Sequence, residues 1–254
     1  MSKPVSAPLP ESGLTSSSGP QVEKIKTVII HGQSHKGSTY NAARLLAAKL
    51  GGSISEFFLP VDFNFFCRGC GACFDDETQC PHHEYLEPML QALDDADVII
   101  LASPVYANHV TGAMKSFLDH CAFRWVLHRP SEKMFLKQGV CVSTAVGEGT
   151  KSANQDMADS LFFWGVPKIY TLGFNVRQLS WDKVSPKIRS KIEVETTALY
   201  LKIKANRKPV MPPRKTRALF NQARKMHKQR GWNRSDVEYW HQHGWDGRQR
   251  PWKF

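Results

Sequence analysis

The feature that most constrains the fold of this chain is a regular alternation of short apolar segments with segments of helical periodicity. The apolar segments are of strand length, and the helical ones carry apolar residues on one face. Expected strands cover residues 25–31, 54–59, 96–103, 139–144 and 168–174, and expected helices cover 41–50, 84–95, 111–123, 152–163 and 186–204. Alternation with such short connections predicts an α/β domain, a doubly wound, five-stranded parallel sheet with helices on both faces.

Composition divides the chain into three parts. Residues 1–22 are rich in Ser, Pro and Gly and lack the apolar core of a signal peptide, so we expect a disordered N-terminal arm and a cytoplasmic protein. Residues 23–205 hold the α/β pattern, and residues 206–254 form a basic, Trp-rich helical tail. No apolar run approaches the roughly 20 residues that a membrane-spanning helix needs, so no membrane partner is expected.

The positive charge is concentrated in the tail. The whole chain has a formal net charge of +11, and residues 200–254 contain 15 Lys or Arg against three acidic residues, which leaves the first 199 residues at −1 (+11 − 12). Interleaved Trp and basic residues could bind nucleic acid. Because no nucleic-acid-binding motif accompanies the charge, we favour a tail that packs its tryptophans on the body or on a second subunit of a homodimer or homotetramer.

Ligands of doubly wound sheets bind at the carboxyl ends of the strands, which directs attention to three loops. The loop after the first strand, 34–41, brings hydroxyls, a Lys and backbone amides to a helix start, where phosphate binds well, although simple capping uses the same groups. The loop at 103–112 contains Ser-Pro-Val-Tyr, which could form a wall for a flat ring. The loop at 144–150 has two glycines that allow close approach of backbone to a ligand.

With GSTYN at 37–41 and SPVY followed by TGAMKSFLD at 103–119, residues 25–175 resemble the flavodoxin-like NAD(P)H-dependent FMN reductases, most closely the iron–sulfur flavoprotein branch. The resemblance implies a flavodoxin-like fold, bound FMN and NAD(P)H as electron donor. It implies phosphate contacts from Ser34, Lys36, Gly37, Ser38, Thr39 and Asn41, ring contacts from Pro104, Val105, Tyr106, Ala107 and Asn108, and closure of the other side by Thr144, Gly147 and Gly149. The family often has Arg in the first loop where this chain has His35-Lys36, so a bidentate phosphate contact is lost.

Four of the six cysteines lie close together in the sequence, as Cys67-x2-Cys70-x2-Cys73-x6-Cys80 followed by Pro81. Four thiolates at this spacing could ligate a 4Fe-4S cluster, as in iron–sulfur flavoproteins. They could instead be free or redox-active thiols beside the flavin, and a structural zinc site is a third interpretation, which the short middle spacing makes less natural. Cys121 and Cys141 fall in helix and strand patterns and are expected in the core.

Three histidines are secondary candidates. His82 and His83 follow the cysteines and could ligate a metal, but surface positions near a helix start are favoured. His109 could donate a proton to flavin or substrate, although a solvated loop His is the simpler interpretation.

Taken together, the loops and the resemblance predict an FMN-dependent oxidoreductase that passes electrons from NAD(P)H through flavin to an unidentified acceptor, with no catalytic side chain assigned. The alternative is an iron–sulfur flavoprotein acting as an electron carrier. A flavodoxin-fold binding module without flavin is disfavoured by the SPVY and GSTYN loops.

Overall fold

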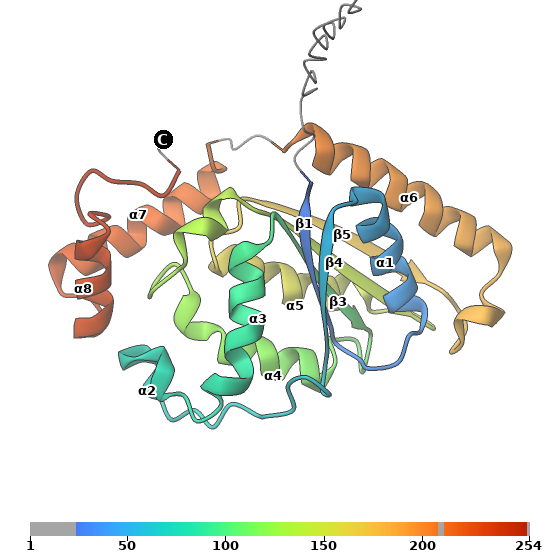
Figure 1. Ribbon diagram of the computed structural model, residues 1–254, viewed down its shortest axis with the longest axis horizontal. Coiled ribbons are helices and arrows are strands. Elements are labelled where there is room, and N and C mark those ends of the chain that lie inside the picture. Colours follow the sequence, from blue (N-terminus) through green and yellow to red (C-terminus); the bar gives the residue numbers. More distant parts are fainter. Residues whose placement is uncertain (1–23, 208–210, 253–254) are drawn as a thin grey trace, which may run out of the picture.

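The computed structural model describes residues 24–207 and 211–252. Its centre is a five-stranded parallel sheet in the order β2-β1-β3-β4-β5 (Figure 1). The strands are β1 (Lys26–His31), β2 (Ser53–Phe58), β3 (Val98–Pro104), β4 (Gln138–Ala145) and β5 (Lys168–Asn175). The order reverses between β1 and β3, and this switch point is where doubly wound sheets bind ligands. The predicted fold class is confirmed.

Helices cover both faces of the sheet (Figure 1). One face carries α1 (Ser38–Leu50) and α6 (Pro186–Ala205), and the other carries α3 (His83–Asp95), α4 (Gly112–His120) and α5 (Thr150–Phe163). Each strand contributes alternate side chains to the two cores, so Ile29 packs with α1 and Ile30 packs with α3 and α4. Because the central strands are buried on both faces, their sequences are continuously apolar. Cys121 and Cys141 are fully buried, as expected.

The C-terminal extension folds into α7 (Arg214–Gln229) and α8 (Arg234–Gln242), which lie beside the α3 and α5 side of the body (Figure 1). A third apolar cluster joins them to it: Val126 and Phe135 of the body pack with Phe220, Trp240, Trp245 and Trp252 of the extension. The tryptophans thus pack on the body of the same chain. The predicted division between a domain at residues 23–205 and a tail at 206–254 stays a prediction, and the predicted arm at 1–22 lies outside the described residues.

Some element boundaries differ from the sequence prediction. The helix expected over 111–123 ends at His120, and a 3-10 turn, η2 (Ala122–Arg124), follows, which brings Arg124 inward to the carboxylate of Asp94 at 2.5 Å. The segment between β2 and α3, expected as one long loop, contains α2 (Ala72–Asp75) and η1 (Glu77–Gln79). Two more 3-10 turns, η3 (Glu132–Leu136) and η4 (Trp181–Lys183), precede β4 and α6. No helix among the described residues is long and apolar enough to cross a membrane.

Candidate functional site

The loops after β1 and β3 meet at the switch point and are held together by hydrogen bonds. Thr111 donates its hydroxyl to the carbonyl oxygen of Gly32 at 2.6 Å, and Gln33 donates to the Tyr106 hydroxyl at 2.7 Å. A β-carbon on Gly32 would lie 3.0 Å from both Ser103 Oγ and Thr111 Oγ1, so this close contact needs glycine. The two loops therefore form one preassembled edge.

The start of α1 offers unsatisfied donors at this edge. Its N-cap residue, Gly37, supplies no side-chain cap. The Ser38 hydroxyl is buried and makes no hydrogen bond to any described residue. The neighbouring Thr39 hydroxyl lies 2.6 Å from that of Thr144, which ties α1 to the end of β4. A buried hydroxyl without a partner beside uncapped helix amides fits a phosphate group, which would accept from all of them.

Two further residues predicted to bind phosphate have other contacts. Asn41 donates its side-chain amide to the carbonyl oxygens of Gly37 at 2.8 Å and Lys36 at 3.3 Å. The Lys36 ammonium lies 5.5 Å from the centre of the Tyr40 ring. In this arrangement Asn41 shapes the loop, and Lys36 is the cation of the loop. Their predicted contacts with phosphate stay predictions.

Residues 105–109 form a tight turn that presents an aromatic ring. Tyr106 and His109 exchange two backbone hydrogen bonds of 2.9 and 3.0 Å, and Ala107 and Asn108 between them take positive φ values of 47° and 66°. The Tyr106 side chain is 49% exposed, so its ring is available as the predicted wall. His109 is exposed and its Nδ1 lies 3.0 Å from the Asp156 carboxylate, which fits a solvated loop histidine.

The loop after β4 lies directly against this turn. Gly149 has φ of +97°, and a β-carbon there would lie 2.7 Å from Val105 Cγ1 and from Asn108 Oδ1. Gly147 differs, because a β-carbon at that position would meet no atom within 4 Å. The structure thus brings the three predicted loops together at one edge, and the close approach at Gly149 fixes two of them relative to each other.

A cavity of about 670 Å³ opens beside these loops, at the carboxyl end of β5. Its lining includes four cations, Arg177, Lys183, Lys187 and Lys191, and no carboxylate. Thr150, which directly follows Gly149, also lines it. A cavity with this lining suits an anionic group. Sequence analysis missed it because its cations are spread over the loop after β5, η4 and the first turns of α6, with no local pattern.

The four clustered cysteines line a second, smaller cavity of about 140 Å³. Burial, and after it the thiols of Cys80, Cys67 and Cys70, raise the pKa of Cys73 to about 11. His82 and His120 line the same cavity. His82 is the N-cap of α3, so it lies at a helix start as expected, but it is half-buried and its Nδ1 lies 2.9 Å from Nε2 of His120.

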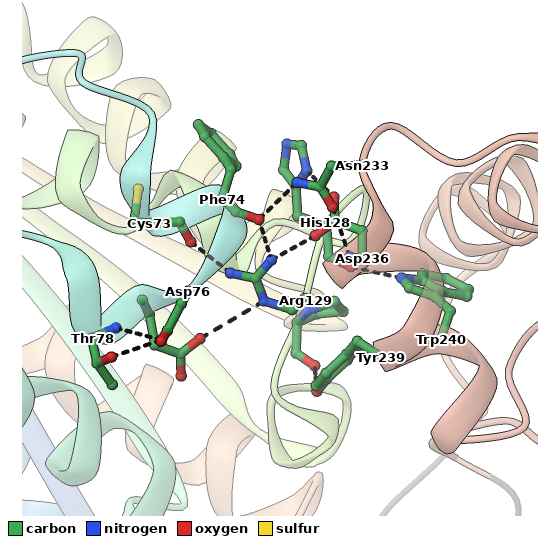
Figure 2. Close-up of polar contacts among 12 residues, drawn as sticks. Cys73, Phe74, Asp76, Thr78, His128, Arg129, Asn233, Asp236, Tyr239 and Trp240 are labelled. Carbon is green, nitrogen blue, oxygen red and sulfur yellow. Dashed lines mark hydrogen bonds and ion pairs between the residues drawn. The ribbon is translucent and has the colours of Figure 1, made fainter.

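Arg129 anchors the cysteine segment to the rest of the molecule (Figure 2). Its guanidinium donates to the carbonyl oxygens of Cys73 at 2.5 Å and Phe74 at 2.6 Å, and to the carboxylate of Asp236 at 2.8 Å. Asn233 also donates to the Phe74 carbonyl, at 2.7 Å. The C-terminal extension therefore helps to position the cysteines, a role that no local sequence pattern indicates.

Comparison with known proteins identifies the family. The sequence pattern of the family described as NADPH-dependent FMN reductase matches residues 25–178, more than half of the chain. The chain belongs to this family. The matched region begins at β1 and ends just after β5, so it contains all three loops of the site, whereas α6 and the extension lie outside it.

Two proteins that are similar in sequence to this chain are iron–sulfur flavoproteins. An iron–sulfur flavoprotein of Archaeoglobus fulgidus is 31% identical over 143 residues, 54% of this chain and 63% of the relative. An iron–sulfur flavoprotein of Methanosarcina thermophila is 26% identical over 144 residues, 55% of this chain and 72% of the relative. The chain thus spans less than two thirds of the Archaeoglobus protein.

Solved structures agree on the fold. An FMN-dependent NADH-azoreductase from Bacillus anthracis, solved in complex with FMN, superposes with a TM-score of 0.52 at 11% identity. The alignment covers 68% of this chain and 99% of the azoreductase. At this identity the likeness establishes the flavodoxin-like arrangement alone.

Proposed function

We propose that this protein is an FMN-dependent oxidoreductase that takes electrons from NAD(P)H and passes them to an acceptor. The observation that carries the proposal is the buried, unpartnered hydroxyl of Ser38 at the uncapped start of α1. Family membership supports the same cofactor. FMN, when bound, would supply the redox chemistry, accepting a hydride from the nicotinamide and releasing electrons to the acceptor.

The side chains of this chain would bind and orient the cofactor. Ser38 and the first amides of α1 would donate to the phosphate, while Thr39, through its hydrogen bond to Thr144, keeps the helix start in register with β4. Tyr106, whose hydroxyl is fixed by Gln33, would lie against the ring. Gly149 would allow backbone to approach the ring from the neighbouring loop. The other loop residues that the sequence predicts as FMN contacts are proposed as contacts too, because the structure brings all three loops to one edge of the sheet.

The cavity at the end of β5 supports a phosphate-rich donor. Val176 donates its backbone N–H to Ala145 O at 2.8 Å, so the cavity wall is paired directly with the end of β4, whose loop belongs to the flavin edge. We infer that Arg177, Lys183 and Lys187 bind the phosphates of the nicotinamide dinucleotide while its nicotinamide reaches the flavin.

Titration of the apoprotein with FMN tests the proposal. Ser38→Ala should weaken FMN binding roughly tenfold or more, because a hydrogen bond to a charged group contributes about 1.5–3 kcal/mol. The stability of the apoprotein should not fall, since the hydroxyl has no partner to lose among the described residues. Ser53→Ala at the opposite edge of the sheet is the control. Absence of FMN binding by the parent protein would refute the function.

An iron–sulfur flavoprotein is the second candidate, favoured by the four cysteines around one cavity. Cys67, Cys70, Cys73 and Cys80 would ligate a 4Fe-4S cluster, which would make the protein an electron carrier. Iron and sulfide analysis of anaerobically prepared protein distinguishes the candidates. If the parent protein binds FMN but contains neither iron nor sulfide after reconstitution, the electron-carrier function is refuted and the reductase function stands.

We also infer a homo-oligomer, a dimer or a tetramer. Its support is a set of large apolar side chains that stay exposed on the single chain, among them Val194 and Leu201 of α6 at 62% and 58%. Light scattering of the purified protein tests this.

A further inference from the structure

Cys80, His82 and His120 form a compact group of metal-ligating side chains. One ligand atom from each lies within 4.8 Å of the others. Cys80 and His82 precede α3, whereas His120 is the last residue of α4, so the group exists only in the folded chain. It is also the only such group of three or more among the residues that the structure describes.

The His120 ring is already held as a metal ligand would be. Its Nδ1 lies 2.7 Å from the carbonyl oxygen of Ser116. A carbonyl can only accept, so Nδ1 carries the proton and Nε2 presents its lone pair toward His82 and Cys80. An imidazole that ligates a metal typically has its other nitrogen fixed by such a hydrogen bond.

Aromatic packing holds both rings in place. His120 is buried, and the Phe63 ring contacts it edge-on with 4.8 Å between centres. His82 stacks on Phe65, with centres 4.6 Å apart. Phe65 is in turn fixed by a hydrogen bond from the Ser116 hydroxyl to its carbonyl oxygen. Little rotational freedom would therefore be lost when an ion binds.

We propose that Cys80, His82 and His120 form a mononuclear site for a divalent ion of the zinc type. Thiolate and imidazole are the usual protein ligands of zinc, which favours four-coordinate geometry. These three residues line one cavity together with Cys67, Cys70 and Cys73, and that cavity leaves room for water as the fourth ligand. This site is separate from the three loops proposed for FMN.

Binding would release one proton. In the metal-free protein His82 Nδ1–H donates to His120 Nε2, because the latter carries no proton. On binding, that proton moves to Nε2 of His82, so both imidazoles stay neutral and each gives a lone pair to the ion. The Cys80 thiol loses its proton to solvent and binds as thiolate.

The proposed site and a four-iron cluster need different residues. A cluster would use Cys67, Cys70, Cys73 and Cys80 and no imidazole. The mononuclear site needs His82 and His120, and it does not need Cys67 or Cys70. Only Cys80 belongs to both ligand sets, so substitutions of the other ligands distinguish the mononuclear site from a four-iron cluster.

Cobalt titration of the full-length, metal-free protein under anaerobic conditions tests the proposal. Thiolate-bound Co²⁺ gives a charge-transfer band in the near ultraviolet, and Zn²⁺ should displace it. We expect one Co²⁺ per chain in the parent. Cys80→Ser, His82→Ala and His120→Ala should each weaken binding by more than the roughly 10- to 100-fold that loss of an outer partner costs.

His83→Ala is the matched control, because His83 adjoins His82 in the sequence but contacts Glu87, at 3.2 Å. It and Cys67→Ser should bind Co²⁺ like the parent. Absence of stoichiometric binding, binding that survives His82→Ala, or loss in Cys67→Ser would overturn the proposal. Because His120 is buried, circular dichroism is used to check that His120→Ala is folded. If His120→Ala unfolds, Co²⁺ binding by His82→Ala decides the test, since His82 is only half-buried. FMN affinity should be unchanged in His82→Ala, which separates this test from that of the flavin site.

Discussion

Arg129 and Asp236 form a buried ion pair between the body and the C-terminal extension, with 2.8 Å between Nη1 and Oδ1 (Figure 2). The other oxygen of Asp236 lies 2.9 Å from Nδ1 of His128. Asp236 is fully buried, and its own backbone N–H donates to the Asn233 side chain at the start of α8. This carboxylate therefore links three elements: the loop after α4, the cysteine segment through Arg129, and the extension.

Asp236→Ala should lower the free energy of unfolding by about 3–5 kcal/mol, because it removes the closest carboxylate of the buried Arg129 guanidinium, whose other acid, Glu77, lies 3.8 Å away. Chemical denaturation of the parent and the variant measures the difference. Asp246→Ala is the control: Asp246 pairs with His241, which is 80% exposed, and surface pairs contribute about 0–1 kcal/mol. Equal effects of the two substitutions would mean that the extension is only loosely attached.

The central fold could be predicted from the sequence because its signals are local. Buried parallel strands such as β3 are continuous apolar runs, and α1 ends at the glycines that follow it. The three loops could also be placed, because parallel strands bring their carboxyl ends to one edge. Predicted helix ends were wrong where tertiary contacts determine where a helix stops. The helix that ends at His120 is an example, because the chain turns there and Arg124 reaches Asp94.

Contacts between distant segments could not be predicted. His82 and His120 are 38 residues apart, and Arg129 and Asp236 are 107 apart, and neither pair carries a local pattern. The same holds for the cavity at β5, whose cations come from the loop after β5, from η4 and from the first turns of α6. A single sequence shows which residues could ligate or pair, but the packing of helices decides which of them meet.

Gly149→Ala should weaken FMN binding and destabilise the loop. Its φ of +97° is strained for any L-residue, and its β-carbon would collide with Val105 and Asn108 at 2.7 Å. Such strain costs on the order of 1–3 kcal/mol. Fluorescence titration with FMN and thermal unfolding measure both effects. For stability the control is Gly147→Ala, two residues away with open space around its β-carbon, which should unfold at the same temperature as the parent; an equal loss of stability there would mean that the loop responds to any added side chain.

Reversing charge in the cavity at β5 should raise the KM for the nicotinamide donor. Lys183→Glu combined with Lys187→Glu puts two carboxylates where phosphates are proposed to bind, so KM should rise at least about tenfold, since each 1.4 kcal/mol is a factor of ten. NADPH should be affected more than NADH, because it carries one more phosphate. FMN affinity should be unchanged.

The matched control for that experiment lies on the same helix. Lys202→Glu with Lys204→Glu makes the same change of net charge at the exposed far end of α6. If both double variants raised KM equally, the effect would come from the overall field of the protein. Unchanged KM in the Lys183 and Lys187 variant would place the donor phosphates elsewhere.

Lys137 should make stability depend on pH in the alkaline range. Its buried ammonium donates to the carbonyl oxygens of Asp94, at 2.8 Å, and Ala96, and burial lowers its pKa from 10.5 to about 8. Folding therefore penalises the charged form. The penalty is complete below about pH 8, shrinks as the pH rises, and disappears above the unfolded-state pKa. From this group alone, the folded state gains stability between pH 8 and 10.5, by at most about 3 kcal/mol.

Comparison with Lys137→Met isolates this contribution, because the variant has no titratable group at the position. The free energy of unfolding of the parent minus that of Lys137→Met should rise between pH 7 and pH 10, measured by urea denaturation at each pH. Lys133→Met is the control: Lys133 is 57% exposed in a loose pair with Asp95, so its difference from the parent should stay flat. A flat difference for Lys137→Met would show that the ammonium keeps an ordinary pKa in the folded protein and that its two carbonyl partners compensate fully for burial.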